Sequence, residues 1–348
     1  MKLYKQIFII LVIFLKTETL FSENKLFNVN NIEIEKKDKI TNKVLADKAI
    51  REGFNQLKTK ILLKKDIDKL QDLKFSSIKQ LVEYYQITNI SKEKKKREIL
   101  NFSVTFDKDK MHNLFFKKGI SYSKILDKEL YILPLLIKDS NIFIFNNNYF
   151  YENWNEFYKN DLIEFILPIE NIEIIQKIND YKNNLININL IDLFEEYSDK
   201  NLALILIENS KGNNIKVYIK SIIQRKNISK NINLRNNEIS INNFEEKIIL
   251  EIKKELINLV KSKNLIDIRT PLFLNAKLNL NKKSNLVKLK AKIKKIDSIE
   301  NIYVQEFNKD YMNLRIKYFG KLEKIIIQLK KESINLQMNN DEWTIKTL

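Results

Sequence analysis

The sequence predicts an α+β protein made of two or three small α/β domains, the last of them ferredoxin-like, behind an amino-terminal export signal. Three observations lead to this prediction. Segments in which apolar and polar residues alternate, as in strands, are interspersed with segments that repeat apolar residues at helical spacing. The 348 residues exceed the usual size of one domain. The chain also begins with a short basic and then apolar stretch.

Residues 1–22 are typical of a secretory signal peptide. Lys2 and Lys5 precede an apolar run at 7–15, and Ser22 precedes a charged residue. The run is too short for a helix to cross about 30 Å of hydrocarbon. We therefore expect cleavage after Ser22 and a periplasmic or secreted protein. The alternative is an uncleaved segment 7–15 that anchors the chain in the inner membrane, facing the periplasm.

The region 24–120 is predicted to be an α+β domain. Thr41 or Asn42 can cap its long helix, and Gly119 suits the left-handed position after a helix. The apolar periodicity predicts a strand at 32–34, helices at 44–63 and 76–85, a strand at 100–106, and a short helix between Asp107 and Gly119.

The region 122–263 is predicted to be an α/β domain. Pro134 interrupts its first strand and favours an edge or a bulge. The strand at 202–207 is apolar on both faces and is expected to be central. The remaining expected elements are a strand at 130–137, a loop at 146–148, helices at 154–166, 190–197 and 244–261, a turn at 211–214, and a strand at 215–219 with one wet face.

The region 268–348 is predicted to have the β-α-β-β-α-β order of a ferredoxin-like domain. Val287, Leu289, Ala291 and Ile293 alternate with lysines and predict its first strand. The elements expected to follow are a helix at 296–301, strands at 302–307 and 314–318, a helix at 321–332, and a closing strand or hairpin from 336 to 345.

The composition excludes several classes of site. The chain has no cysteine and one histidine, so a disulfide framework, a thiolate zinc site and a multi-histidine metal site are excluded. Its four glycines are scattered, so there is no Walker loop and no dinucleotide-binding fingerprint. We expect no catalytic, cofactor-binding or metal-binding residues and no cofactor.

The net charge of +18 suggests an acidic partner, but a solvated basic surface explains it as well. Only six of the 62 basic residues are arginine, the residue that phosphate recognition favours. The densest basic run, Lys92–Arg97, is expected to be a solvated loop, with anion binding as the minority interpretation. A nucleic-acid partner is not expected.

The candidate catalytic groups have simpler structural interpretations. His112 follows an inward-facing methionine and lacks a nucleophile motif, so we expect a surface or half-buried side chain. The acidic clusters lie on predicted amphipathic helices, where solvated carboxylates are normal: Asp192, Glu195, Glu196 and Asp199, and Glu245, Glu246, Glu251 and Glu255.

The densest aromatic cluster is expected to pack in the core or between domains, with a carbohydrate or protein contact as the alternative. Glu152 and Glu156 are interleaved with it and would repel phosphate. Its members are Tyr149, Phe150, Tyr151, Trp154, Phe157 and Tyr158.

Several short motifs are shared with a known group of proteins: Ala46-x-x-Ala49, Val104-Thr105-Phe106-Asp107, Gly119, Leu133-Pro134-Leu135-Leu136 and Trp154. Over residues 30–165 the chain thus resembles an uncharacterised family of exported bacterial proteins, "domain of unknown function 2066". By element order, the middle region resembles the amino-terminal α/β domain of TolB. These resemblances imply a periplasmic interaction module and no catalytic residues.

The leading hypothesis is a non-enzymatic envelope protein that contacts other envelope proteins or an anionic polymer. A second hypothesis is a hydrolase of an envelope glycan that uses carboxylates such as Glu152 and Glu195, which must then lie roughly 5 to 9.5 Å apart. A third is nonspecific binding of an anionic lipid or polymer, which would weaken steeply with salt.

Overall fold

The computed structural model describes residues 26–36, 41–92, 98–156, 162–209, 214–235, 241–280, 284–339 and 342–347. The predicted signal peptide, its cleavage after Ser22, most of the basic run and Phe157 and Tyr158 lie outside these ranges. The chain is an α+β protein with several small sheets. It divides into two compact units, one formed by residues up to Tyr122 together with those from Leu265 onward, and the other by Ser123–Asn264. No helix in the described ranges is both long and apolar enough to cross a membrane.

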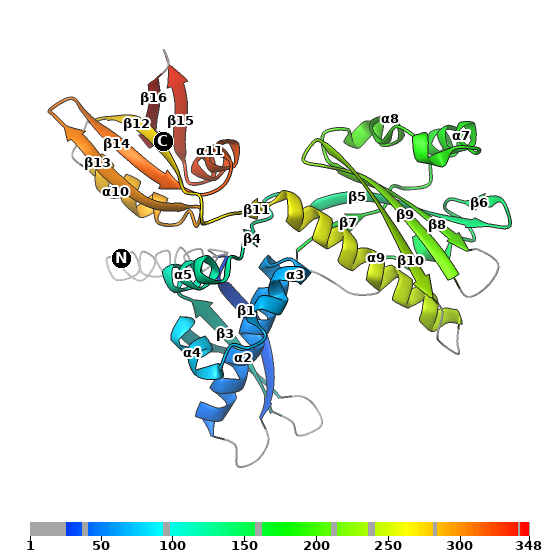
Figure 1. Ribbon diagram of the computed structural model, residues 1–348, viewed down its shortest axis with the longest axis horizontal. Helices are drawn as coiled ribbons and strands as arrows, with labels where there is room; N and C mark the ends of the chain where they lie inside the picture. The colour runs from blue at the N-terminus through cyan, green and yellow to red at the C-terminus, as the bar shows by residue number, and fades with distance from the viewer. Residues whose placement is uncertain are drawn as a thin grey trace, which may run out of the picture. The chain divides into compact units, whose positions relative to one another are not determined.

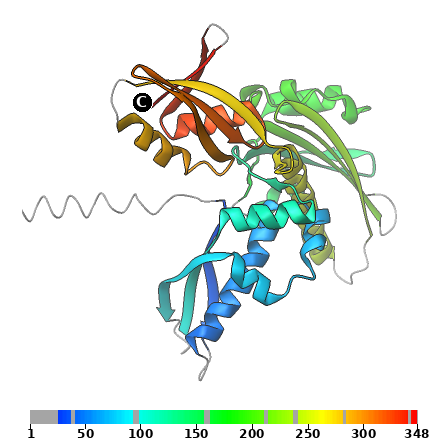
Figure 2. The same cartoon turned by 60° about the vertical axis from the view of Figure 1, so that its left-hand side comes forward.

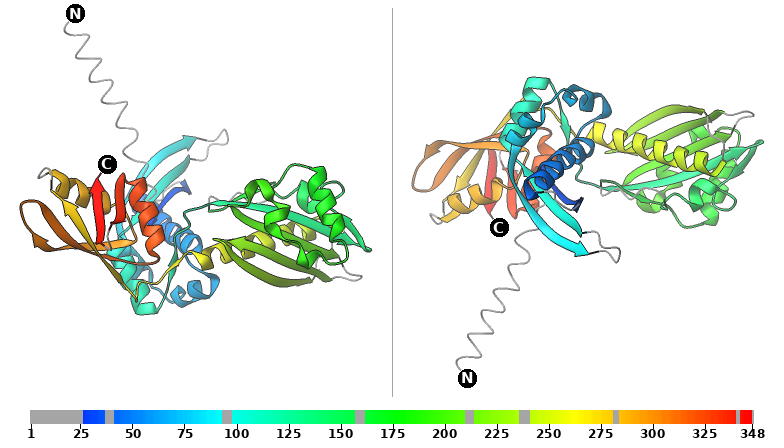
Figure 3. Two further views of the ribbon diagram at one scale, coloured as in Figure 1. Left: turned by 90° about the horizontal axis from the view of Figure 1, so that it is seen from above. Right: turned by 90° about the horizontal axis from the view of Figure 1, so that it is seen from below.

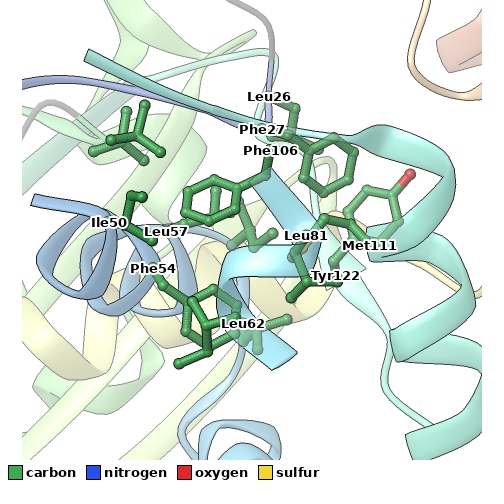
Figure 4. Close-up of a cluster of buried hydrophobic side chains, with 14 of the residues drawn as sticks. Leu26, Phe27, Ile50, Phe54, Leu57, Leu62, Leu81, Phe106, Met111 and Tyr122 are labelled. Atoms are coloured by element: carbon green, nitrogen blue, oxygen red, sulfur yellow. The ribbon is translucent and has the colours of Figure 1, made fainter. Parts of the chain in front are cut away.

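The first unit begins with a three-stranded antiparallel sheet of order β1-β3-β2 (Figure 1). Helix α2 packs on it, and Phe54 of α2 meets Phe106 of β3 at a ring distance of 5.8 Å in the core that Figure 4 shows. The elements are β1 (Asn28–Lys36), α2 (Asn42–Ile61), α3 (Lys64–Ile67), a 3-10 turn (Asp68–Leu70), α4 (Phe75–Leu81), β2 (Val82–Lys92), β3 (Glu98–Phe106) and α5 (Lys108–Lys118).

Helix α5 lies between Asp107 and Gly119, as predicted. The Asp107 side chain accepts a hydrogen bond from the amide of Lys110, and Gly119 takes the left-handed conformation with φ 59°. Thr41 occupies the position before α2 but forms no side-chain cap. The prediction of a helix over 76–85 is wrong beyond Leu81, because Val82 begins the edge strand β2, paired along its length with β3.

The carboxy-terminal part of the first unit is a five-stranded sheet of order β13-β14-β12-β16-β15 with α10 and α11 on one face (Figure 2). Its order β-α-β-β-α-β-β contains the predicted ferredoxin-like order and adds β16, which lies between β12 and β15. The elements are β12 (Leu272–Asn279), α10 (Ser284–Ile293), β13 (Ile299–Phe307), β14 (Tyr311–Tyr318), α11 (Leu322–Lys331), β15 (Ile334–Asn339) and β16 (Glu342–Thr347).

The first strand of this region was placed wrongly by the sequence pattern. Residues 287–293 belong to α10, in which Leu289 and Ile293 are buried and Val287 is 71% exposed. The spacing of Leu289 and Ile293 is also one helical turn, so alternation over a few residues fits both structures. The expected helix at 296–301 is a turn that leads into β13.

The second unit is a six-stranded mixed sheet of order β10-β9-β8-β5-β6, with β7 also paired to β5. Long helix α9 covers one face, and α7 and α8 cover part of the other, as the two views of Figure 3 show. The elements are β5 (Glu129–Lys138), β6 (Asn141–Phe143), α6 (Tyr149–Glu152), β7 (Glu164–Ile166), α7 (Ile172–Asp180), α8 (Leu190–Leu193), β8 (Asn201–Asn209), β9 (Asn214–Ile223), β10 (Lys226–Arg235) and α9 (Ile241–Lys263). Short strands β4 (Tyr122–Ser123) and β11 (Leu265–Ile266) pair separately.

Two predictions for this region are corrected. The expected helix at 154–166 is wrong, because α6 ends at Glu152 and residues 164–166 form β7. The expected helix at 190–197 is a short α8 followed by a 3-10 turn.

Strand β8 is central, as predicted, since it pairs with β5 and β9. Pro134 lies where β5 pairs with β8 on one side, between the segments that pair with β7 and β6 on the other.

Candidate ligand groove

A groove of about 510 Å³ lies on the sheet face of the second unit that carries α7 and α8. Its volume is in the range of small-molecule sites. The floor is formed by neighbouring strands and one wall by the segment that follows α7. The residues that line it are Ile137, Leu206, Glu208, Lys216, Val217, Tyr218, Asn231 and Asn233 on the strands, and Lys182, Asn183, Asn184, Leu185 and Ile186 on the wall.

Part of this sheet face is left uncovered by helices, because the side chains on the face change from apolar to polar from one strand to the next. Register pairs Leu206 of β8 with Tyr218 of β9, and Tyr218 with Asn231 of β10, so the three side chains lie in one row on the same face. Helices α7 and α8 cover the leucines of β5 and β8. The row therefore runs from a covered apolar end to an exposed amide.

A lysine holds the wall of the groove against its floor. The Lys220 ammonium, on β9, donates to the carbonyl oxygens of Ile186 and Ile188 at 2.8 and 2.7 Å. These charge-assisted bonds tie the 3-10 turn Leu185–Asn187 to the sheet. The Tyr218 hydroxyl donates to Ser229 Oγ at 3.0 Å, which ties the ring to β10. The groove is thus held by polar contacts at both sides.

The charges at the groove are sparse and mostly positive. Lys182 and Lys216 are exposed, and neither forms an ion pair with a carboxylate in the described part of the chain. Glu208 is the acidic member of the lining and is the register neighbour of Lys216. The exposed amides of Asn231 and Asn233 can each donate and accept hydrogen bonds. The arrangement offers two cations and several amides to an anionic, polar ligand.

His112 is buried, in contrast to the surface or half-buried position expected. Its Nε2 lies 3.1 Å from the Tyr122 hydroxyl, and the rings of Phe27 and Phe319 meet it edge-on. Burial, together with the nearby positive charge of Lys108, lowers the pKa of His112 to about 4, although Asp297 opposes the shift. Burial also raises the pKa of Tyr122. A neutral imidazole enclosed by aromatic rings is a packed core residue.

The candidate carboxylates between Asp192 and Asp199 are exposed, whereas those on α9 are half-buried, and burial raises the pKa of Glu245. Glu152 is exposed at the end of α6, and Glu195 is exposed on the 3-10 turn after α8, where it pairs with Lys177 at 3.2 Å. On α9, Glu251 pairs with Lys254 at 2.6 Å and Glu255 pairs with Lys230. No cluster of three metal-ligating side chains occurs within the described ranges.

The described members of the aromatic cluster pack in the cores on the two sides of the sheet. Phe150 and Trp154 are fully buried on the α9 side, and Tyr149 packs against them. Tyr151 packs on the other side and donates to the Pro168 carbonyl at 2.7 Å. The neighbouring Asn148, expected only as a loop residue, is also buried.

The sequence interpretation missed the groove. Its signal was the alternation in residues 227–234, where Ile228, Ile232 and Leu234 pack inward and Asn231 and Asn233 point to the open face. Alternation cannot predict the wall, because the position of Lys182 at the groove depends on the path that the chain takes after α7.

Comparisons with known proteins add no function. No family model matches the chain, and no curated protein matches it. A solved structure described as that of an uncharacterized protein is similar over 40% of this chain and 94% of its own, with 9% sequence identity and a TM-score of 0.17. A score this low carries no argument about fold or function.

Proposed function

We propose that the protein is a non-enzymatic interaction module of the cell envelope, exported by residues 1–22, whose second unit binds an anionic polymer in the groove. The observation that carries the proposal is the pair of exposed lysines, Lys182 and Lys216, at a groove that is otherwise lined by asparagines, Tyr218, aliphatic side chains and a single carboxylate. Excess positive charge attracts polyanions, and a groove can bind them at one defined position, which a flat surface cannot.

Export is part of the proposal and has its own test. The basic start and the apolar run at 7–15 support it. Mass spectrometry of the protein recovered from the periplasmic fraction is expected to read an amino terminus at Glu23. Recovery from the cytoplasm with the initiator end intact would contradict export. Recovery from the membrane with residues 7–15 present would instead support the anchored alternative.

Binding is tested with the chain lacking residues 1–22 and a panel of polymers: polygalacturonate and polyphosphate as polyanions, and dextran as the neutral reference. At low ionic strength we expect at least one polyanion to bind, and the double variant K182Q/K216Q to weaken that binding at least fivefold. The matched control K288Q/K290Q removes the same charge from exposed positions on α10.

The two double variants separate a groove from a diffuse charge effect. If both weaken binding equally, the basic surface acts as a whole and the groove has no special role. If dextran binds as tightly as the polyanions, charge is not the basis of recognition. Either result overturns the proposal.

A further inference from the structure

We infer that the groove selects an acidic polysaccharide, a chain of sugar rings with about one carboxylate per ring, over a densely charged phosphate polymer. This inference rests on the proposed function and names the ligand class of the same groove. Three features of the lining support it: the aromatic floor, the paired amides and the single carboxylate.

The floor offers a flat apolar surface beside polar groups. Tyr218 is half-buried, its ring flanked in register by Leu206 on one side and Asn231 on the other. Its hydroxyl hydrogen is committed to Ser229 Oγ, which orients the ring. An aromatic face packs well on the apolar C–H face of a sugar ring, whereas a phosphodiester chain without bases has no comparable apolar face.

The amides match hydroxyl groups better than phosphate oxygens. Asn231 and Asn233 are two positions apart on β10, so both project to the open face, and neither side chain hydrogen-bonds another residue in the described part of the chain. Each amide has donors and an acceptor, as a sugar hydroxyl has. Phosphate oxygens only accept, so a phosphate could use the amide donors but not the amide acceptors.

The charges fit a sparsely charged ligand. Lys182 and Lys216 provide two positive charges, and Glu208 provides one negative charge in the same lining. A polymer with a charge on every phosphate would place anions near Glu208 and be repelled. A sugar chain can turn a hydroxyl toward Glu208, which accepts its hydrogen bond, while its carboxylates meet the lysines.

The decisive experiment compares polygalacturonate with polyphosphate at equal charge concentration, by titration calorimetry, on the chain lacking residues 1–22. We expect polygalacturonate to bind at least tenfold tighter. N231A/N233A is expected to weaken polygalacturonate binding at least fivefold and leave polyphosphate binding within twofold. Y218A is expected to weaken it tenfold, and Y218F, which keeps the ring, less than threefold.

The outcomes separate this inference from the proposed function. Tighter binding of polyphosphate, sensitive to K182Q/K216Q, overturns the sugar assignment and leaves the groove as an anion site. Polygalacturonate binding that N231A/N233A does not change also overturns the assignment. If K182Q/K216Q changes the binding of neither polymer, both the sugar assignment and the proposed function are overturned. Because Y218A removes a packed ring, thermal unfolding is used to check that this variant is folded. If Y218A is unfolded, the test depends on N231A/N233A, whose substituted side chains are exposed.

Discussion

His112 and Tyr122 stack inside the first unit, with ring centroids 5.4 Å apart, planes 20° from parallel and Nε2 3.1 Å from the hydroxyl. They come from α5 and from β4. Phe319, which follows β14, closes the cluster at 5.7 Å from the His112 ring. The contact therefore joins the amino-terminal and carboxy-terminal parts of one unit and buries the imidazole.

We expect the single histidine to make the protein acid-sensitive. The folded pKa of about 4 lies below the unfolded value of 6.5, so between these values the unfolded state binds more protons. Stability is then full above about pH 6.5 and falls as pH approaches 4, by up to about 3 kcal/mol. In H112F we expect the free energy of unfolding to lack this decrease. Urea unfolding at pH 7, 5.5 and 4.5 measures it. An imidazole NMR titration midpoint near 6.5 would refute the prediction.

We expect G53A to destabilise the protein although it adds a better helix former. A Cβ at Gly53 would lie 2.9 Å from Ile32 Cδ1 and 3.4 Å from Val104 Cβ, where α2 crosses the sheet. Ile32 is fully buried, so its methyl group has little room to move, and we expect an overpacking cost in the upper part of the range of about 1–3 kcal/mol, above the helix-propensity gain of about 1 kcal/mol.

The second substitution I32V removes the clashing methyl group, so G53A/I32V is expected to be more stable than the sum of the single variants predicts. The free energy of unfolding in urea measures this coupling. Strict additivity of the two substitutions would show that the helix does not approach the sheet at Gly53.

We expect N148A to cost at least about 2 kcal/mol of stability. The Asn148 amide donates to the carbonyl oxygens of Pro134, Phe143 and Ile144 at 2.8 to 3.0 Å, and its oxygen accepts from the amides of Phe150 and Tyr151. Its loss leaves buried backbone groups unsatisfied. N146A is the control, because Asn146 is exposed and its amide donates to the exposed Glu170 side chain. Equal thermal unfolding of the two variants would count against the prediction.

We expect a stability increase at alkaline pH that depends on Lys253. Its ammonium donates to the Trp154 carbonyl at 2.6 Å, and burial lowers the pKa of Lys253 to about 8. The unfolded pKa of 10.5 is higher, so the unfolded state binds more protons above pH 8 and stability rises with pH.

K253M is expected to lose this rise, about 2 kcal/mol between pH 7 and 9.5, whereas K254M is expected to keep it. Lys254 is the exposed neighbour on α9. Lys261 and Lys324 also have pKa values lowered to about 8 by burial, but they are present in all three proteins and cancel in the comparison. The same pH dependence in K253M and the parent protein would refute the assignment.

Elements with a long, one-sided pattern could be predicted from the sequence. In three elements the residues of the element alone indicate its type and its buried side. These are the apolar stripe of α2, the alternation of β3 and the apolar run of β8. The start of α5 at Asp107 and the left-handed Gly119 after it depend on local chemistry, and the sequence predicts both for the same reason. The limits are clearest where pairing decides the structure, as in β2, which becomes a strand by pairing with β3.

The missed hairpin between β9 and β10 has a specific cause. Its two turn residues, Gln224 and Arg225, both have positive φ, at 51° and 60°. Such turns usually carry asparagine, aspartate or glycine, so the sequence contained no turn signal there. Without β10, the exposed amides that line the groove had no position in the sheet.

The sequence by itself determined the α+β class, the main helices and strands with one apolar face, and the capped ends of α5, because these follow from periodicity and from side-chain contacts within a few residues. Only the tertiary structure decided that His112 is buried against Tyr122 and Phe319, that Pro134 lies in a partly paired strand, and that Lys182 and Asn231 line one groove. Each of these depends on contacts between residues distant in the chain, whose pairing no local pattern encodes.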